Sequence, residues 1–251
     1  MSNFHDVRMW LIDKWSIRNF EPYKYPLGPD EYFFGTFGLL SALTSDTEDL
    51  ATLMHELKVC AVRENVQYLE VIGIAPNVPA DGYLGDKYKS YSEALRDYAL
   101  QANSSMLYRL YTTMCTCIDN NAQAQADIDV YLASVYEIED KCNAMDDPVV
   151  DMGVVTIRNL VCRYQGYAVR NLNPVMFFAQ LYIVLKACQK DERGLLVGCN
   201  IVAAENGENS MTYYFAHMIM FSYFHKEAFS ANIITLTLSR RATSIFGYVL
   251  P

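Results

Sequence analysis

The histidines offer the most versatile chemistry in this sequence, because an imidazole can ligate a metal or transfer a proton near neutral pH. The chain has four of them: His5, His55, His217 and His225. His217 and His225 lie on one predicted helix, eight residues apart, which separates them by ~12 Å along the helix axis. Zinc ligands must all lie within ~2.1 Å of one ion. The histidines therefore predict no metal site.

Glu70 is the acidic residue whose position offers acid–base chemistry. It lies in a short apolar stretch, residues 67–74, that predicts a buried strand. A carboxyl group in such surroundings can have a perturbed pKa and act as an acid or a base. It can equally hold a neighbouring strand through a hydrogen bond. With no titrating partner visible, the structural role is favoured, and both interpretations stay open.

The cysteines favour a reducing compartment over catalysis. There are seven, and Cys115 and Cys117 are the closest pair. An odd number would leave a free thiol in an exported protein, so a cytoplasmic location is predicted. The sequence has no Cys/His/Asp arrangement for covalent catalysis, no phosphate-binding loop and no dinucleotide fingerprint.

Composition excludes two classes of partner. The net charge of −9 and the pI near 4.9 argue against nucleic acid, which is bound mainly through Lys and Arg. No apolar run reaches the ~18 residues that a membrane span requires, so no membrane partner is predicted. At 251 residues, about half of them hydrophobic, the chain can form a sizeable core.

Hydrophobic periodicity and breakers predict alternating strands and helices. Helices are predicted over 8–20, 30–40, 47–63, 174–189 and 209–229, with two long ones in 90–145 split near 118–122. Strands are predicted over 67–74, 154–162, 195–203 and 233–238. This alternation is typical of βαβ units, so the expected fold class is α/β with a parallel sheet.

Several segments resemble the adenosine deaminase family, which belongs to the metal-dependent amidohydrolases. They are Asn65-Val66-Gln67-Tyr68-Leu69-Glu70-Val71, Asn171-Leu172-Asn173-Pro174, Phe178-Ala179-Gln180-Leu181, 197–206 and the His217-Met218-x-Met220-Phe221 stretch. The resemblance implies a (β/α)₈ barrel that deaminates adenosine to inosine with a zinc-activated water. Residues 1–251 are accordingly expected to form one incomplete barrel domain covering strands two to five, with a long helical insert at 75–152.

The chain departs from the family where the metal should bind. The family's His-x-His is absent, and Ser239-Arg240-Arg241-Ala242 stands where His-Ala-Gly-Glu should follow the fifth strand. No catalytic residue and no zinc site is therefore assigned to this chain. We expect a truncated deaminase-like protein that is inactive alone. The alternatives are half of a split enzyme completed by another chain, and a non-catalytic interaction protein, with homo-oligomers expected.

The resemblance also implies a site for a purine nucleoside. Phe33, Phe34 and Phe37 match positions where the family places apolar groups over the purine, although their spacing alone indicates only helix packing. Ala203 and Glu205 match the loop after the fourth strand, which reads Gly-Asp-Glu in the family. Ala203 replaces a glycine there, and its methyl group is expected to crowd the ligand.

Overall fold

The computed structural model describes residues 2–16, 18, 20–26, 28–40, 46–146, 149–150, 153–154 and 156–228. The chain divides into two compact units, Met1–Leu50 and Ala51–Pro251. Whether 1–251 should count as one domain stays a prediction.

The first unit contains α1 (Ser2–Trp15), the short 3₁₀ turn η2 (Pro22–Lys24) and α2 (Pro29–Leu40). Pro29 at the first helical position is favourable, because its missing N–H would have no helical partner there. The rings of Phe20, Tyr25 and Tyr32 pack together, and the Tyr32 hydroxyl donates to the Ser16 carbonyl at 2.7 Å. This small aromatic cluster connects the end of α1 to α2.

The second unit is built on a parallel sheet of three strands. They are β1 (Tyr68–Ile72), β4 (Val161–Val169) and β5 (Leu196–Val202), in the order β1-β4-β5. A separate antiparallel pair consists of β2 (Val149–Val150) and β3 (Gly153–Val154). Each parallel connection crosses over through helices, as parallel strands require.

The two faces of the sheet differ in character. Cys162, Tyr164, Gly166 and Ala168 of β4 are buried on the helical side. A methyl group on Gly166 would collide with the Tyr131 hydroxyl and with Val184, so a side chain there would force the helices away. The opposite face carries the alternate residues: Tyr68, Glu70, Ile72, Val161, Arg163, Gln165 and Tyr167.

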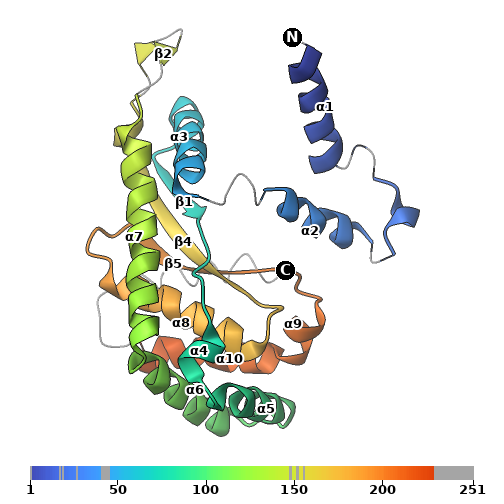
Figure 1. Cartoon of the computed structure of the whole chain (residues 1–251), viewed down its shortest axis with the longest axis vertical. Helices are drawn as coiled ribbons and strands as arrows, with labels where there is room; N and C mark the ends of the chain where they lie inside the picture. Colours follow the sequence, from blue (N-terminus) through green and yellow to red (C-terminus); the bar gives the residue numbers. More distant parts are fainter. Residues whose placement is uncertain are drawn as a thin grey trace. The chain divides into compact units, whose positions relative to one another are not determined.

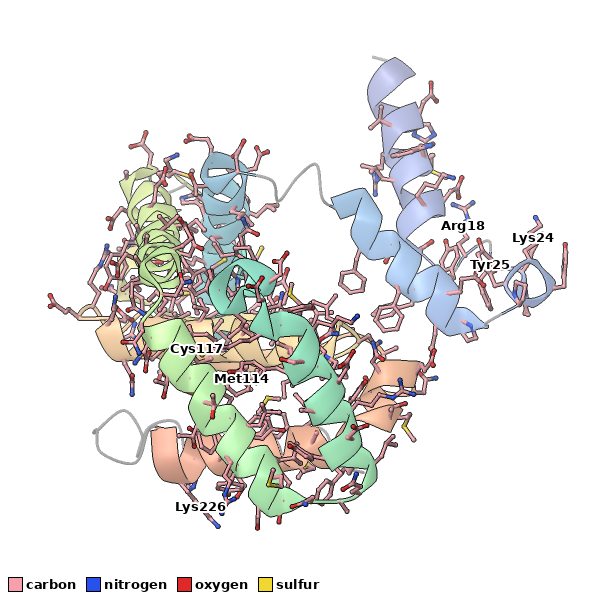
Figure 2. All side chains as sticks on the ribbon, turned by 60° about the horizontal axis from the view of Figure 1, so that its bottom comes forward. Arg18, Lys24, Tyr25, Met114, Cys117 and Lys226 are labelled. Carbon is pink, nitrogen blue, oxygen red and sulfur yellow. The ribbon has the colours of Figure 1, made fainter. Side chains whose placement is uncertain are left out.

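Helices fill the space on the buried side of the sheet (Figure 1). They are α3 (Thr47–Arg63), α4 (Ala80–Leu84), α5 (Lys87–Leu100), α6 (Ser104–Asp119), α7 (Ala122–Ala144), α8 (Pro174–Lys190), α9 (Glu208–Thr212) and α10 (Tyr214–Tyr223), followed by η5 (Phe224–Ala228). Helix α8 packs directly on β4 and β5 and is buried nearly all round, because α4, α5 and α7 cover its other side. On α6, Met114 is fully buried and Cys117 is half-buried; both are labelled in Figure 2.

Asparagine caps set the starts of three helices. The side-chain oxygens of Asn103, Asn121 and Asn173 accept hydrogen bonds from backbone N–H groups in the first turns of α6, α7 and α8. Such a cap satisfies donors that have no partner inside the helix. Helix α6 ends at Asp119 and α7 begins at Ala122, with Asn120 and Asn121 between them. The predicted split near 118–122 is therefore confirmed.

A buried ion pair joins α3, α7 and β4. Lys58 Nζ lies 2.9 Å from both Glu139 carboxylate oxygens and 3.3 Å from Asn143 Oδ1. The Tyr164 hydroxyl donates to Glu139 at 2.7 Å. Burial raises the pKa of the Glu139 carboxyl, but the bonds from Lys58 and Tyr164 outweigh it and hold that pKa below its ordinary value. Every donor of the Lys58 ammonium therefore has an acceptor.

The prediction of a partial (β/α)₈ barrel covering strands two to five is wrong. The described residues form a mostly helical α/β structure whose parallel sheet has three strands. The strand predicted at 154–162 is instead β4, which begins at Val161. Arg163 and Gln165 lie on the face of the sheet away from α8, and these polar residues interrupt the apolar run of β4. The strand was therefore predicted over the more apolar residues that precede them.

Other predicted elements are confirmed at their positions. Helix α3 has the predicted bounds, and α8 and β5 agree within a residue. Residues 90–145 hold most of α5 together with α6 and α7, one helix more than predicted. The strand predicted at 233–238 and the Ser239–Ala242 segment lie outside the described residues. None of the described helices combines the length and apolar character needed to cross a membrane.

Candidate functional site

The candidate site lies where β4 and β5 end. Because the two strands are parallel, their carboxyl ends lie at the same edge of the sheet, the edge where α/β proteins commonly bind ligands. The loop after β4 begins at Arg170 and runs into α8. The loop after β5, residues 203–207, runs into α9.

Asn171 holds the two loops together. Its Nδ2 donates to the Ala204 carbonyl at 3.1 Å, and its Oδ1 accepts from the Ser210 hydroxyl at 2.6 Å. A methyl group on Gly207 would collide with the Asn171 side chain, so the glycine permits this close approach. The loops that carry the candidate residues are therefore fixed to each other.

Ala203 adopts an unusual backbone conformation. Its φ is 82°, in the left-handed region that strongly favours glycine. A residue with a Cβ pays of order 1–3 kcal/mol to stay there, and such residues concentrate at functional sites. The family resemblance implies a glycine at this position. The observed φ of Ala203 is one that glycine adopts without steric cost.

Arg170 is the cation of the site. Its Nη2 donates to the Ile201 carbonyl at 3.0 Å, and its Nη1 lies 3.5 Å from Glu205 Oε1. The Arg170 side chain is 14% exposed, whereas that of Glu205 is 66% exposed. Burial lowers the pKa of the guanidinium and Glu205 partly opposes the shift. Its Nε is buried and has no hydrogen-bond partner among the described residues.

His217 of α10 is the buried imidazole of the site and is 6% exposed. Its ring lies 4.5 Å from that of Phe177, centroid to centroid. Burial, aided by the positive charge of Arg170, lowers the pKa of His217 to about 4, so the imidazole is neutral at pH 7. Its Nε2 is also buried without a partner in the described part of the chain.

The predicted ligand residues fall into two groups. Ala203 and Glu205 lie together beside Arg170 in the second unit. Phe33, Phe34 and Phe37 lie on α2 in the first unit, exposed, with ring centroids 5.2–6.2 Å apart. Each group is brought together within its own unit. Their joint role in one site stays a prediction.

The first unit also contains a groove of about 450 Å³ between α1 and α2. Asp13, Glu31, Tyr25 and Tyr32 contribute to its lining, and Tyr25 is labelled in Figure 2. None of the predicted ligand residues lines it.

Glu70 has a structural partner on the neighbouring strand. Gln165 of β4 donates to its carboxylate, and the Tyr68 hydroxyl donates to it at 2.6 Å. The Gln165 bond links β1 to β4 on the face away from α8, and the Tyr68 bond lies within β1. They fit the structural role favoured from the sequence.

The side chains that the structure describes do not fit the zinc that the family resemblance implies. A zinc site with open catalytic chemistry needs three converging protein ligands. Among the described residues, no three His, Cys, Asp or Glu side chains gather in such a group. His217 contacts aromatic rings instead, those of Phe177 and Tyr213.

The sequence predicts a ligand role for Ala203 and Glu205, which stays a prediction, and it does not single out Arg170 or the burial of His217. In the sequence, His217 stands out only as a possible metal ligand and as part of the 217–221 stretch of the family resemblance. No clear signal in the sequence marks Arg170, because the strand predicted there ends at residue 162, whereas β4 ends at Val169. Comparisons with protein-family models, with curated proteins and with solved structures find no match.

Proposed function

We propose that this chain is an adenosine deaminase-like protein that binds a purine nucleoside where β4 and β5 end, and that it does not deaminate the nucleoside unaided. The resemblance in 65–71 and 197–206 supports the ligand class. The observation that supports the position of the site most strongly is the backbone of Ala203, which is held at a φ of 82° close to the Arg170–Glu205 ion pair. Strain of this kind persists where the surroundings enforce it, as at binding sites.

The polar groups of this loop suit a purine nucleoside. Glu205 supplies carboxylate oxygens that accept hydrogen bonds from N–H groups, and Arg170 supplies donors for ring nitrogens or hydroxyls. The half-buried setting of Arg170 strengthens such bonds relative to water. These residues bind and orient a ligand, and the proposal assigns them no bond-breaking step.

The absence of deamination is proposed from the sequence. The family reaction uses a zinc-bound water, and the sequence carries neither the family's His-x-His nor its His-Ala-Gly-Glu. Without those ligands the chain has no means of its own to make a nucleophilic hydroxide near neutral pH.

Calorimetric titration of the full chain with adenosine and with inosine tests binding, and an adenosine-to-inosine assay tests turnover. We expect saturable binding of adenosine and no inosine formation. The matched pair Ala203→Gly and Ala204→Gly sharpens the test, since only the first lies at a positive φ. Tighter binding by Ala203→Gly alone supports the site. Absence of nucleoside binding, or zinc-dependent turnover, contradicts the proposal.

A second candidate is association with another chain, either one that completes a deaminase or a second copy. The favouring observation is that β1 is an edge strand of the described sheet, and that Tyr68 and Ile72 on it are 42% and 47% exposed. Open edges pair readily with other strands. Sedimentation at micromolar concentration should show dimers or larger species, and a monomer throughout would exclude self-association.

We also propose a cytoplasmic location. Its support is the odd number of cysteines, each of which is a free thiol in the structure. Locating the tagged chain in cells by microscopy tests this.

A further inference from the structure

A groove that the proposed nucleoside site does not use lies between α1 and α2 in the first unit. Its volume is about 450 Å³, within the range of pockets that hold small organic molecules. The side chains that give it its chemistry come from both helices and from the turn between them: Asp13, Lys14, Tyr25, Glu31 and Tyr32. Because these residues line one groove, a single bound molecule can contact charged and aromatic groups together.

The aromatic part of the groove is held in place by contacts within the unit. The rings of Tyr25 and Tyr32 pack edge to face with centroids 5.1 Å apart, and Phe20 packs against both. The Tyr32 hydroxyl donates to the carbonyls of Ser16 at 2.7 Å and of Asp13 at 3.3 Å. These contacts join α2 to the end of α1, so the two helices that border the groove are fixed to each other.

The charges of the groove favour a cation. Asp13 and Glu31 contribute two carboxylates and Lys14 one ammonium, which leaves one negative charge in excess. Asp13 lies in the last turn of α1, where the helix carbonyls add a partial negative charge. The faces of the tyrosine rings are also negative. A cation is therefore attracted by carboxylates, by the end of a helix and by aromatic rings.

Among organic cations, a primary ammonium suits this lining best. It carries three N–H donors, which match carboxylate and carbonyl acceptors. A quaternary ammonium has no donor and is held mainly by cages of aromatic rings. The groove also has room for a carbon body, because nothing lies within 4 Å of the position that a Cβ on Gly35 would occupy.

We propose that the groove between α1 and α2 binds a small primary amine, its ammonium at Asp13 and Glu31 and its carbon body against Tyr25 and Tyr32. Lys14 is the cation of the chain that competes with the ligand, and its exposed, flexible side chain can turn into solvent. The proposal does not rest on the proposed nucleoside site, whose loops belong to the second unit.

Three probes with nearly the same carbon body and different charge test the proposal: phenethylamine, 2-phenylethanol and 3-phenylpropanoate. Nitrogen-15 NMR of the full chain at pH 7 follows the backbone amides of Gly35 and Thr36, which line the groove. Phenethylamine should shift both amides in a saturable way. The alcohol should bind at least about tenfold more weakly, since it lacks the charge-assisted hydrogen bonds, and the carboxylate should not bind.

A pair of glycine variants tests the place of binding. Gly35 and Gly38 both lie on α2 with open space at the Cβ position, and of the two it is Gly35 that lines the groove. Gly35→Leu should abolish the phenethylamine shift of Thr36, whereas Gly38→Leu should bind phenethylamine like wild type.

Charge variants at exposed positions, which leave the packing of the unit intact, test the recognition of the ammonium. Lys14→Gln should bind phenethylamine about twofold or more tightly, because the competing cation is gone. The double variant Asp13→Asn/Glu31→Gln should bind it at least about tenfold more weakly. Unshifted Gly35 and Thr36 amides, equal affinity for the amine and the alcohol, or equal binding by the two glycine variants overturns the proposal, as does weaker binding by Lys14→Gln. None of these results bears on adenosine binding.

Discussion

Two cations of this chain, the buried Lys58 and the half-buried Arg170, have opposite surroundings. Lys58 has three acceptors within 3.3 Å, and its partner Glu139 also accepts from Tyr164 and Asn143. Arg170 has one carbonyl, one loosely placed carboxylate at 3.5 Å and a buried Nε without a partner in the described residues. The Lys58 network is complete, whereas the Arg170 cluster is incomplete.

This difference separates the structural role of the Lys58 network from the binding role proposed for the Arg170 cluster. A complete buried network fixes the packing of α3, α7 and β4 and has no capacity for a ligand. An incomplete one keeps donors that a ligand can use, at a cost in stability. The strained Ala203 lies beside the incomplete cluster, which is where strain and unpaired groups are expected together.

Lys58→Met should produce the largest loss of stability. Removing the ammonium leaves the Glu139 carboxylate buried without its counter-charge, which costs about 3–5 kcal/mol. Urea unfolding at pH 7, followed by circular dichroism, measures the free energy of unfolding. The double variant Lys58→Met/Glu139→Gln should recover much of the loss, because no charge remains buried. Equal losses in the single and double variants would show that the pair is not coupled.

His217 should make the chain less stable in acid. Its pKa is lowered to about 4 in the folded chain, first by burial and then by Arg170, against an ordinary value of 6.5. Between these values the unfolded chain binds more protons, so the free energy of unfolding falls as pH drops from 6.5 to 4. The total fall from this group is roughly 3 kcal/mol.

The measurement is urea unfolding of wild type and His217→Phe at pH 7 and pH 4.5. The variant should lose less stability on acidification than wild type, and the exposed His225→Asn should behave like wild type. If His217→Phe follows the wild-type pH dependence, His217 is not held neutral by its surroundings.

Ala203→Gly should raise the free energy of unfolding by about 1 kcal/mol. Glycine adopts the observed φ of 82° without the steric cost that alanine pays, although the more flexible unfolded chain offsets part of the gain. Ala204→Gly should be neutral or slightly destabilising. A loss of stability in Ala203→Gly as large as that in Ala204→Gly would contradict the strain at Ala203.

Glu205→Gln should have the smallest effect, below about 0.5 kcal/mol. The carboxylate is two-thirds exposed and its ion pair with Arg170 is long, and exposed pairs contribute little. Glu139→Gln, at a buried and fully bonded carboxylate, is the contrasting variant, and the same urea experiment compares them. If Glu205→Gln and Glu139→Gln lower the free energy of unfolding equally, the two networks do not differ in their contribution to stability.

Local elements were predictable where a single physical signal dominated. The cap signals at 45–47 and the apolar stripe of α3 gave its bounds, and Asn173-Pro174 marked the start of α8. Strand β4 was misplaced because Arg163 and Gln165 lie on a sheet face that α8 does not cover. The arrangement of three strands under many helices depends on packing between distant segments, which periodicity does not report.

The candidate site was predictable in its loop but not in its centre. Ala203 and Glu205 lie at and just after the end of the strand predicted over 195–203, and their ligand role, which the family resemblance implies, stays a prediction. A role for His217 could not be predicted, since it depends on Phe177 and Arg170, which precede it by 40 or more residues. Burial of an unpaired nitrogen becomes visible only in the folded chain.

The most direct test of the account compares two buried imidazoles in one sample. His217 and His55 each have a buried Nε2 without a partner in the described chain, but only His217 lies beside Arg170. Nitrogen-15 NMR of the histidines in the full chain, titrated with adenosine, reports on both at once. The account predicts that saturating adenosine shifts the His217 Nε2 resonance and leaves that of His55 unchanged. An unchanged His217 resonance at saturation, or equal shifts of both, would contradict it.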